Sequence, residues 1–165
     1  MSSVIEIRRV RPSDAAAITA IYNPFITDTT VSFETQPLTS VQMLQRIEQI
    51  SAHYPYYVCE IGGQVCGYCY LHPWKERVAY SHTLEVTIYL APSAQSQGVG
   101  RQMLQRLIND GRNMGAKALI ACITEENEHS MHFHRSMGFE QVSHFKNVGY
   151  KFGRMLDVAD FELLL

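Results

Sequence analysis

A glycine-bearing turn past the middle of the chain constrains the fold most. Its sequence is Gln95-Ser96-Gln97-Gly98-Val99-Gly100-Arg101, and it separates an extended run at 83–90 from a helical run that follows. A turn of this kind at the start of a helix presents free backbone N–H groups and the positive end of the helix dipole. The sequence therefore predicts a strand, an anion-binding turn and a helix, which together suit the phosphates of a cofactor.

Composition limits the classes of protein to consider. The chain has 165 residues, of which 46% are hydrophobic and 18% charged, and we expect one domain over 1–165 with a core of its own. The net charge of −2 gives no basic surface, so we expect no nucleic-acid partner. No apolar run reaches the ~18 residues that a membrane span needs, so we expect no membrane partner. The start looks like a strand rather than an export signal, so we expect four reduced cysteines in the cytoplasm.

Hydrophobic spacing predicts a mixed α/β (α+β) domain. Gly62-Gly63 should form the turn of a β-hairpin, and the apolar run 117–123 should be a buried strand in a parallel pair. Asn23-Pro24 should end the first helix. The predicted strands are 4–8, 56–61, 64–72, 83–90, 117–123 and two more near 141–145 and 151–164, and the predicted helices are about 13–22, 39–50, 98–111 and 126–137.

Three phosphate-binding patterns compete for the glycine turn. A dinucleotide fingerprint needs a third glycine where this chain has Met103, and it belongs early in a βαβ unit. A phosphate loop of the Gly-x-x-x-x-Gly-Lys type is absent. The remaining pattern, Gln95, Gly98 and Gly100 between a strand and a helix, resembles the coenzyme A pyrophosphate loop of the GNAT acyltransferase superfamily. A purely structural turn is the alternative.

Further segments strengthen this resemblance. The run from Asn127 through Ser130 to Gly138-Phe139 is similar to the second signature of the family. Nearly the whole chain resembles the branch that contains phosphinothricin and methionine sulfone or sulfoximine N-acetyltransferases, through Tyr22-Asn23, 29–33, Gly67-Tyr68, Pro73-Trp74-Lys75, Glu85 and 151–157. The resemblance implies a twisted, mostly antiparallel sheet of six to seven strands flanked by about four helices, and a homodimer.

The resemblance also implies acetyl transfer from acetyl-CoA to an amine, with no metal. Such amines are mostly protonated at neutral pH, so a general base is needed. Glu85, in an apolar-rich strand, is the first candidate, and the branch has a proposed glutamate base at the matching position. His134 is the second, because imidazole titrates near neutrality. A solvated strand carboxylate and an ordinary helix histidine are the alternatives. Phe133 stands where many relatives have a tyrosine that protonates the departing thiolate, so another group or water serves, or the thiolate leaves unprotonated.

In the superfamily, the strand before the turn diverges from its neighbour, often at a bulge, and its backbone binds the pantetheine arm. The resemblance therefore implies pantetheine contacts at Ile88, Tyr89 and Leu90. It also implies that Asn127 and His132 contact the cofactor arm. The expected pyrophosphate residues are Ser96, Gln97, Gly98, Val99, Gly100 and Arg101.

The acceptor is expected to be a small amino acid or analogue. Lys75 and Arg77, close to Trp74, are placed to bind a carboxylate, and Phe33 and Trp74 to form the walls for an aliphatic side chain. Relatives carry tryptophan where Phe33 stands and often arginine at position 75. A solvated polar loop is the alternative for the segment around Trp74. The rest of the expected acceptor site is Glu76, Glu85, Val86 and Thr87.

Two other patterns, a Cys-x-x-Cys pair and a group of three histidines, do not indicate a redox or metal site. Cys66 and Cys69 form a Cys-x-x-Cys, but within a strand positions three apart face opposite sides. The histidines at 129, 132 and 134 do not share one helix face, so we expect no metal site.

Two further classes of function stay open. One is acetylation of protein N-termini, lysines or aminoglycosides, although aminoglycoside sites are usually acidic and this chain offers Lys75 and Arg77. The other is a catalytically silent acyl-CoA-binding module, against which the presence of Glu85 argues.

Overall fold

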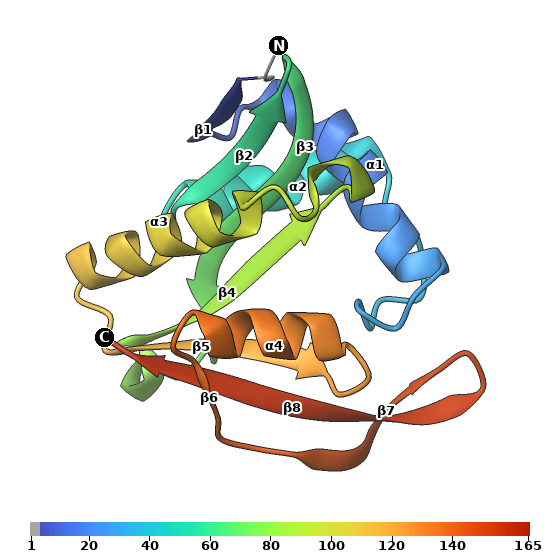
Figure 1. Cartoon of the computed structure of the whole chain (residues 1–165), viewed down its shortest axis with the longest axis vertical. Helices are drawn as coiled ribbons and strands as arrows, with labels where there is room; N and C mark the ends of the chain where they lie inside the picture. Colours follow the sequence, from blue (N-terminus) through green and yellow to red (C-terminus); the bar gives the residue numbers. More distant parts are fainter. Residues whose placement is uncertain (1–3) are drawn as a thin grey trace.

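A computed structural model describes residues 4–165 and contains one twisted sheet with helices on both faces (Figure 1). The strand order is β1-β2-β3-β4-β5-β8-β6, and β7 pairs with β8. The strands are β1 (Ile5–Arg9), β2 (Tyr56–Ile61), β3 (Gln64–Pro73), β4 (Thr83–Leu90), β5 (Ala118–Thr124), β6 (Glu140–Gln141), β7 (Phe145–Lys151) and β8 (Arg154–Leu164). The helices are α1 (Ala15–Thr27), α2 (Ser40–Ser51), α3 (Val99–Asn113) and α4 (Glu128–Ser136), with 3-10 turns η1 (Pro12–Asp14), η2 (Val78–Tyr80) and η3 (Pro92–Ala94).

The sheet separates two apolar cores. One core lies between the sheet and α3 and α4, and it includes Leu84 and Val86 of β4. The other lies between the sheet and α1 and α2, where Tyr89 packs against Tyr22 and Phe25. Because side chains alternate along a strand, Glu85 shares the α1 face with Tyr89. In residues 4–165 no helix combines the length and apolar character needed to cross a bilayer.

Pairing along β4 decides where the sheet opens. β4 pairs with β3 from Leu84 to Leu90 and is parallel to β5, as predicted for the apolar run. The parallel pairing runs only from Thr83↔Ala118 to Glu85↔Ile120, and β5 then continues to Thr124 beside β8. The two strands therefore diverge after Glu85 and leave one side of residues 86–90 without a strand partner.

The first helix is longer than predicted. It continues through Pro24 to Thr27, and the backbone N–H of Asp28 donates to the carbonyl of Pro24. Proline inside a helix costs about 3 kcal/mol. Burial of Tyr22 and Ile26 against the sheet offsets this, since each such side chain contributes roughly 1.5–3 kcal/mol. The prediction of an end at Asn23-Pro24 is wrong because tertiary packing outweighs the local cost.

The C-terminal segment forms three strands where two were predicted, so the sheet has eight strands instead of six to seven. Lys151 is the last residue of β7 and not the first of the final strand. Phe152-Gly153 makes the hairpin turn, with φ of +52° and +73°. A phenylalanine with positive φ is uncommon in turns, and this hid the turn from the sequence pattern.

The Cys-x-x-Cys segment also departs from the prediction. Cys66 and Cys69 lie in the same apolar core as Cys59, instead of on opposite faces. The reason is a β-bulge: Cys59 pairs with Gly67 but the next pair is Glu60↔Val65, which leaves Cys66 unpaired and shifts the alternation.

Candidate active site

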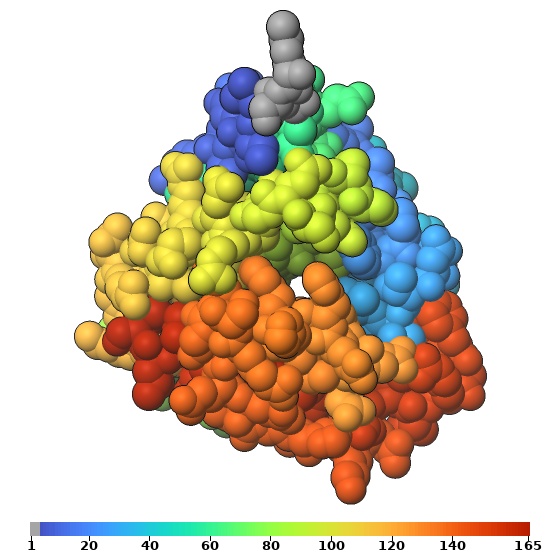
Figure 2. Space-filling model, viewed as in Figure 1, coloured from blue at the N-terminus to red at the C-terminus, as the bar shows by residue number. Residues whose placement is uncertain are grey.

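Two cavities lie side by side where β4 and β5 diverge. The first, of about 460 Å³, is bounded by β4, the 95–101 turn, β5 and α4, and Figure 2 shows the surface hollowed between the segment near residues 90–100 and α4. The second, of about 470 Å³, is bounded by α1, the loop at 31–34 and β5. Molecules bound in the two cavities would meet along their shared lining residues, which are Val31, Glu85, Tyr89, Cys122, Ile123 and Thr124.

The turn before α3 has the geometry of an anion site. Gly98 is the N-cap with φ of +74°, which favours glycine, and Ser96 has φ of +61°. No side chain caps the helix, so the N–H groups of its first turn are available to a ligand. Gln97 points elsewhere, since its side-chain amide donates to the carbonyl of Ser93 at 2.6 Å and it does not line the cavity. The lining residues of the turn are Gln95, Ser96, Gly98, Val99, Gly100 and Arg101.

The diverging half of β4 forms the wall beside this turn. Residues 86–90 line the first cavity, among them Ile88, Tyr89 and Leu90. The β3–β4 register is continuous here, so the opening comes from the divergence of β4 and β5 and not from a bulge in β4. Backbone groups on the free side of β4 are able to pair with an extended ligand, as in strand addition.

Glu85 lies at the junction of the two cavities. Its side chain is 23% exposed, and burial, reinforced by the charge of Asp160 and reduced by a hydrogen bond from the Cys122 thiol, raises the pKa of Glu85 to about 7. The imidazole Nε2 of His72 lies 3.8 Å from Oε1 of Glu85, but burial lowers the pKa of His72, so this ring is uncharged at neutral pH. Glu85 therefore has no cation that fixes its charge, and it is suited to taking up a proton near neutrality.

His134 lines the first cavity but not the second. It is 7% exposed, Nδ1 lies 2.8 Å from the carbonyl oxygen of Ser130, and the rings of Phe133 and Phe139 meet it edge-on. Burial lowers the pKa of His134, so the ring is neutral at physiological pH. Its position is beside the first cavity, which separates it from a molecule in the second.

Helix α4 brings one face to the first cavity. Asn127 is its N-cap, with its side-chain oxygen accepting from the N–H of Ser130, and both line the cavity. His129 also lines it, whereas His132 is exposed and lies outside the lining. His132 lies three residues after His129, on the same side of the helix, and its contact with the cofactor arm stays a prediction. Helical periodicity counted from Asn127 favours Ser130 and His134, which also line the cavity.

The predicted carboxylate-binding loop lies apart from both cavities. Trp74, Lys75, Glu76 and Arg77 line neither of them, while Val86 and Thr87 line the first and Phe33 the second. The ammonium of Lys75 lies 4.4 Å from the ring centroid of Trp74 and 5.2 Å from that of Tyr80. This loop connects the end of β3 to the start of β4. Because it lines neither cavity, its role in acceptor binding stays a prediction.

The sequence analysis did not predict a hydrogen-bonded group of side chains at the edge of the second cavity. Glu34 receives two hydrogen bonds from Arg46 and one from the hydroxyl of Tyr22, which also lies 2.8 Å from Oγ of Ser32. Arg46 is the main reason that the pKa of Glu34 is lowered. The loop at 28–39 has neither helical nor strand periodicity, so no sequence signal marked these residues as neighbours.

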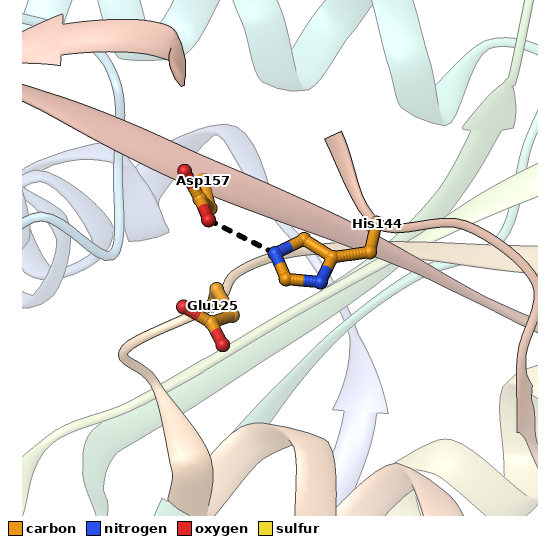
Figure 3. Close-up of side chains that lie close together, drawn as sticks. All are labelled: Glu125, His144 and Asp157. Atoms are coloured by element: carbon orange, nitrogen blue, oxygen red, sulfur yellow. Dashed lines mark hydrogen bonds and ion pairs between the residues drawn. The ribbon is translucent and has the colours of Figure 1, made fainter. Parts of the chain in front are cut away.

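A separate polar cluster lies on β8, shown in Figure 3. His144 Nε2 is 2.9 Å from a carboxylate oxygen of Asp157, whose other oxygen accepts from the backbone N–H of Asn147, and Glu125 lies beside them. None of these four residues lines either cavity. The two hydrogen bonds to Asp157 connect the chain at residues 144–147 to β8. That the protein binds no metal stays a prediction.

Comparison with known proteins gives the family. A family model described as an acetyltransferase (GNAT) domain matches residues 7–159. The L-amino acid N-acyltransferase of Escherichia coli K12 is 35% identical over 98% of this chain and 94% of its own length. The L-methionine sulfoximine/L-methionine sulfone acetyltransferase of Salmonella typhimurium LT2 is 34% identical over 96% and 94%. A crystal structure of a phosphinothricin acetyltransferase from Sinorhizobium meliloti with acetyl-CoA superposes with a TM-score of 0.93 and 32% identity, covering 100% of this chain and 89% of that one.

The chain belongs to the GNAT family of acetyltransferases. Both the family model and relatives above 30% identity span nearly the whole chain, and the eight-stranded mixed sheet has the fold of that family. The family resemblance predicted from the glycine turn and the 127–139 segment is confirmed, and so is the predicted fold class.

Proposed function

We propose that this chain transfers the acetyl group of acetyl-CoA to the amine of a small amino acid or amino acid analogue, by direct attack of the amine on the thioester. The single observation that carries the proposal is the position of Glu85 at the junction of the two cavities. With a pKa of about 7, Glu85 removes a proton from the ammonium and frees the lone pair that attacks. The relatives named for L-amino acids, methionine sulfoximine and phosphinothricin support this acceptor class.

The donor occupies the first cavity. The amides at the start of α3 hold the pyrophosphate, while residues 86–90 pair with the pantetheine arm. Contacts from Ile88, Tyr89, Leu90 and Asn127 bring the thioester carbonyl beside Glu85. Phe133 cannot donate a proton, so the coenzyme A thiolate leaves without help from a tyrosine at this position.

The acceptor occupies the second cavity. Val31, Phe33 and Val158 give this cavity apolar walls that suit an aliphatic side chain. Glu34 stays ionised because of Arg46, and the Glu34–Arg46 ion pair gives this cavity a polar side opposite its apolar walls. Glu85 then lies between the acceptor amine and the donor.

The proposal extends to a homodimer of a single 165-residue catalytic domain in the cytoplasm. Large apolar side chains are exposed on β7, its turn and the start of β8, namely Phe145, Val148, Tyr150, Phe152 and Met155. An apolar surface next to an edge strand suits contact with a second copy. The four cysteines are free thiols, as a reducing compartment would keep them. Sedimentation velocity tests the dimer.

A thiol-release assay with acetyl-CoA and methionine sulfone, methionine sulfoximine or phosphinothricin tests the function. The proposal expects turnover with at least one of these amines. Turnover only with peptide N-termini, lysines or aminoglycosides would contradict the acceptor class. Binding of acetyl-CoA by folded protein without turnover of any amine would support a silent binding module instead.

A further inference from the structure

The loop at 28–34 forms one wall of the second cavity without being a helix or strand. Val31, Ser32, Phe33 and Glu34 all line this cavity. Thr30 and Ser32 are nevertheless buried, at 8% and 4% exposure. Contacts from outside the loop help to fix its backbone, and they come from the C-terminal hairpin of β7 and β8 and from the end of β5.

Lys151 fixes the loop from the end of β7. Its side chain is 4% exposed, and its ammonium donates to the carbonyl of Thr29 at 2.7 Å and to that of Ser32 at 2.6 Å. The ring of Phe152 lies 5.0 Å from the same nitrogen. Among the described residues no carboxylate forms an ion pair with Lys151, and burial lowers its pKa. The lysine thus acts on loop carbonyls and not on an acidic side chain.

A second set of contacts fixes the same loop from β8 and β5. Arg154 makes two hydrogen bonds of 2.8 Å to Glu126, which in turn accepts from the hydroxyl of Thr30. The hydroxyl of Thr124 donates to the carbonyl of Thr30 at 2.7 Å. The loop backbone is therefore held at the carbonyls of Thr29, Thr30 and Ser32, which restrains it when a neighbouring side chain is displaced.

Gly149 of β7 lies directly behind Phe33. A Cβ built on Gly149 would be 2.7 Å from Cζ of Phe33 and closer still to Cε2, which no real contact allows. Gly149 is not among the positive-φ glycines, so its lack of a side chain serves the close approach of Phe33 and not a turn. Phe33 is 42% exposed and lines the second cavity, so the ring has room to leave β7, and we expect it to move toward that cavity.

We propose that Gly149 is a specificity-determining position, because it lets the ring of Phe33 lie back against β7 and keeps space in the second cavity for the acceptor side chain. Lys151 and Arg154 are positioning residues that hold the loop bearing this ring. The inference rests on the proposed function, in that the second cavity takes the acceptor.

The test compares Gly149→Ala with the wild type over an acceptor series of rising side-chain length, such as alanine, 2-aminobutyrate and methionine sulfone. We expect kcat/KM for the longest accepted amine to fall by about tenfold or more relative to the shortest, since small changes in an apolar pocket have effects of this size. KM for acetyl-CoA should not change, because Gly149 and Phe33 do not line the first cavity.

A double-mutant cycle separates this effect from general destabilisation. In a Phe33→Ala background, the Gly149→Ala change should no longer alter the acceptor ratio, because no ring remains to be displaced. If Gly149→Ala does not fold, Phe33→Ala alone should shift the ratio toward longer acceptors. An unchanged ratio in the folded single variants, or an equal effect of Gly149→Ala with and without Phe33, would overturn the inference.

The proposed function and this inference fail in different ways. If the wild type acetylates no amine, the proposed function fails, and a crystal structure of Gly149→Ala still tests the inference: the ring of Phe33 should move into the second cavity, and an unmoved ring would refute it. If the wild type acetylates amino acids but Gly149→Ala keeps the wild-type acceptor ratio, the function stands and the inference fails.

Discussion

At the scale of single residues, Glu85 has an unusual environment for a strand carboxylate. It is mostly buried, it faces two cavities, and its near neighbours are an uncharged imidazole at His72, a thiol at Cys122 and the like charge of Asp160. None of these stabilises a negative charge as an arginine would. The ionised form is therefore costly in the free protein, and this cost gives Glu85 the basicity that its proposed role needs.

The pH dependence of activity follows from this environment. The base must be ionised to act, so kcat/KM should fall as pH drops through about 7, the pKa of Glu85. Glu85→Gln should lower kcat by about 10²-fold or more and remove this acid limb. Glu162→Gln is a matched control, because Glu162 is a strand carboxylate that pairs with Ile120 outside both cavities. An acid limb that survives in Glu85→Gln would assign it to another group.

The raised pKa of Glu85 should lower the free energy of unfolding at high pH. The pKa of Glu85 is raised on folding, so the folded state holds its proton more tightly and loses stability as pH rises from about 4.5 to 7. Glu85→Gln should therefore gain stability over the wild type above pH 7, on the order of 2–3 kcal/mol, and little below pH 4.5. Chemical unfolding at pH 4.5 and pH 8 measures the difference. Equal stability changes at the two pH values would show that Glu85 ionises normally in the folded protein.

At the scale of elements, helix α3 has a left-handed glycine at each end. Gly98 precedes it with φ of +74° and Gly115 follows it with φ of +83°, and an added Cβ would have open space at both. An alanine in this conformation costs roughly 1–2 kcal/mol at either position. The two ends differ in what they face, because Gly98 lines the first cavity and Gly115 does not.

Paired substitutions at these glycines separate stability from binding. Gly98→Ala and Gly115→Ala should lower the free energy of unfolding by similar amounts, roughly 1–2 kcal/mol. Only Gly98→Ala should weaken acetyl-CoA binding in calorimetry, because it disturbs the amides that hold the pyrophosphate. Equal affinities in the two variants would remove the turn from the donor site.

Elements with a strong local signal could be predicted from the sequence, whereas those set by packing could not. The Gly62-Gly63 hairpin and a helix that begins near residue 39 follow from local chemistry, and the structure contains both. The continuation of α1 past Pro24 depends on burial against the sheet. In the candidate site, residue types and spacing predicted the glycine turn, and the family resemblance added support for Glu85. The Tyr22–Glu34–Arg46 group could not, because its members meet only when α1, the loop and α2 pack together.

At the scale of the whole molecule, the proposed function depends on the opening of the sheet between β4 and β5. β4 and β5 pair at Glu85 and diverge beyond it, so a single strand carries the proposed base on its paired part and the proposed pantetheine contacts on its free part. The glycine turn continues from the free part into α3. The C-terminal hairpin, more than 110 residues away in sequence from the loop at 28–34, holds the loop that lines the proposed acceptor cavity.

The central claim is that main-chain amides of the turn and of the open strand hold the donor so that its acyl carbon lies beside Glu85. Titration of the ¹⁵N-labelled protein with coenzyme A, followed by amide NMR signals, tests it most directly. We expect saturable shifts concentrated at residues 98–101 and 86–90. Saturable shifts elsewhere with these amides unmoved, or no shifts at all from a folded protein, would contradict the account.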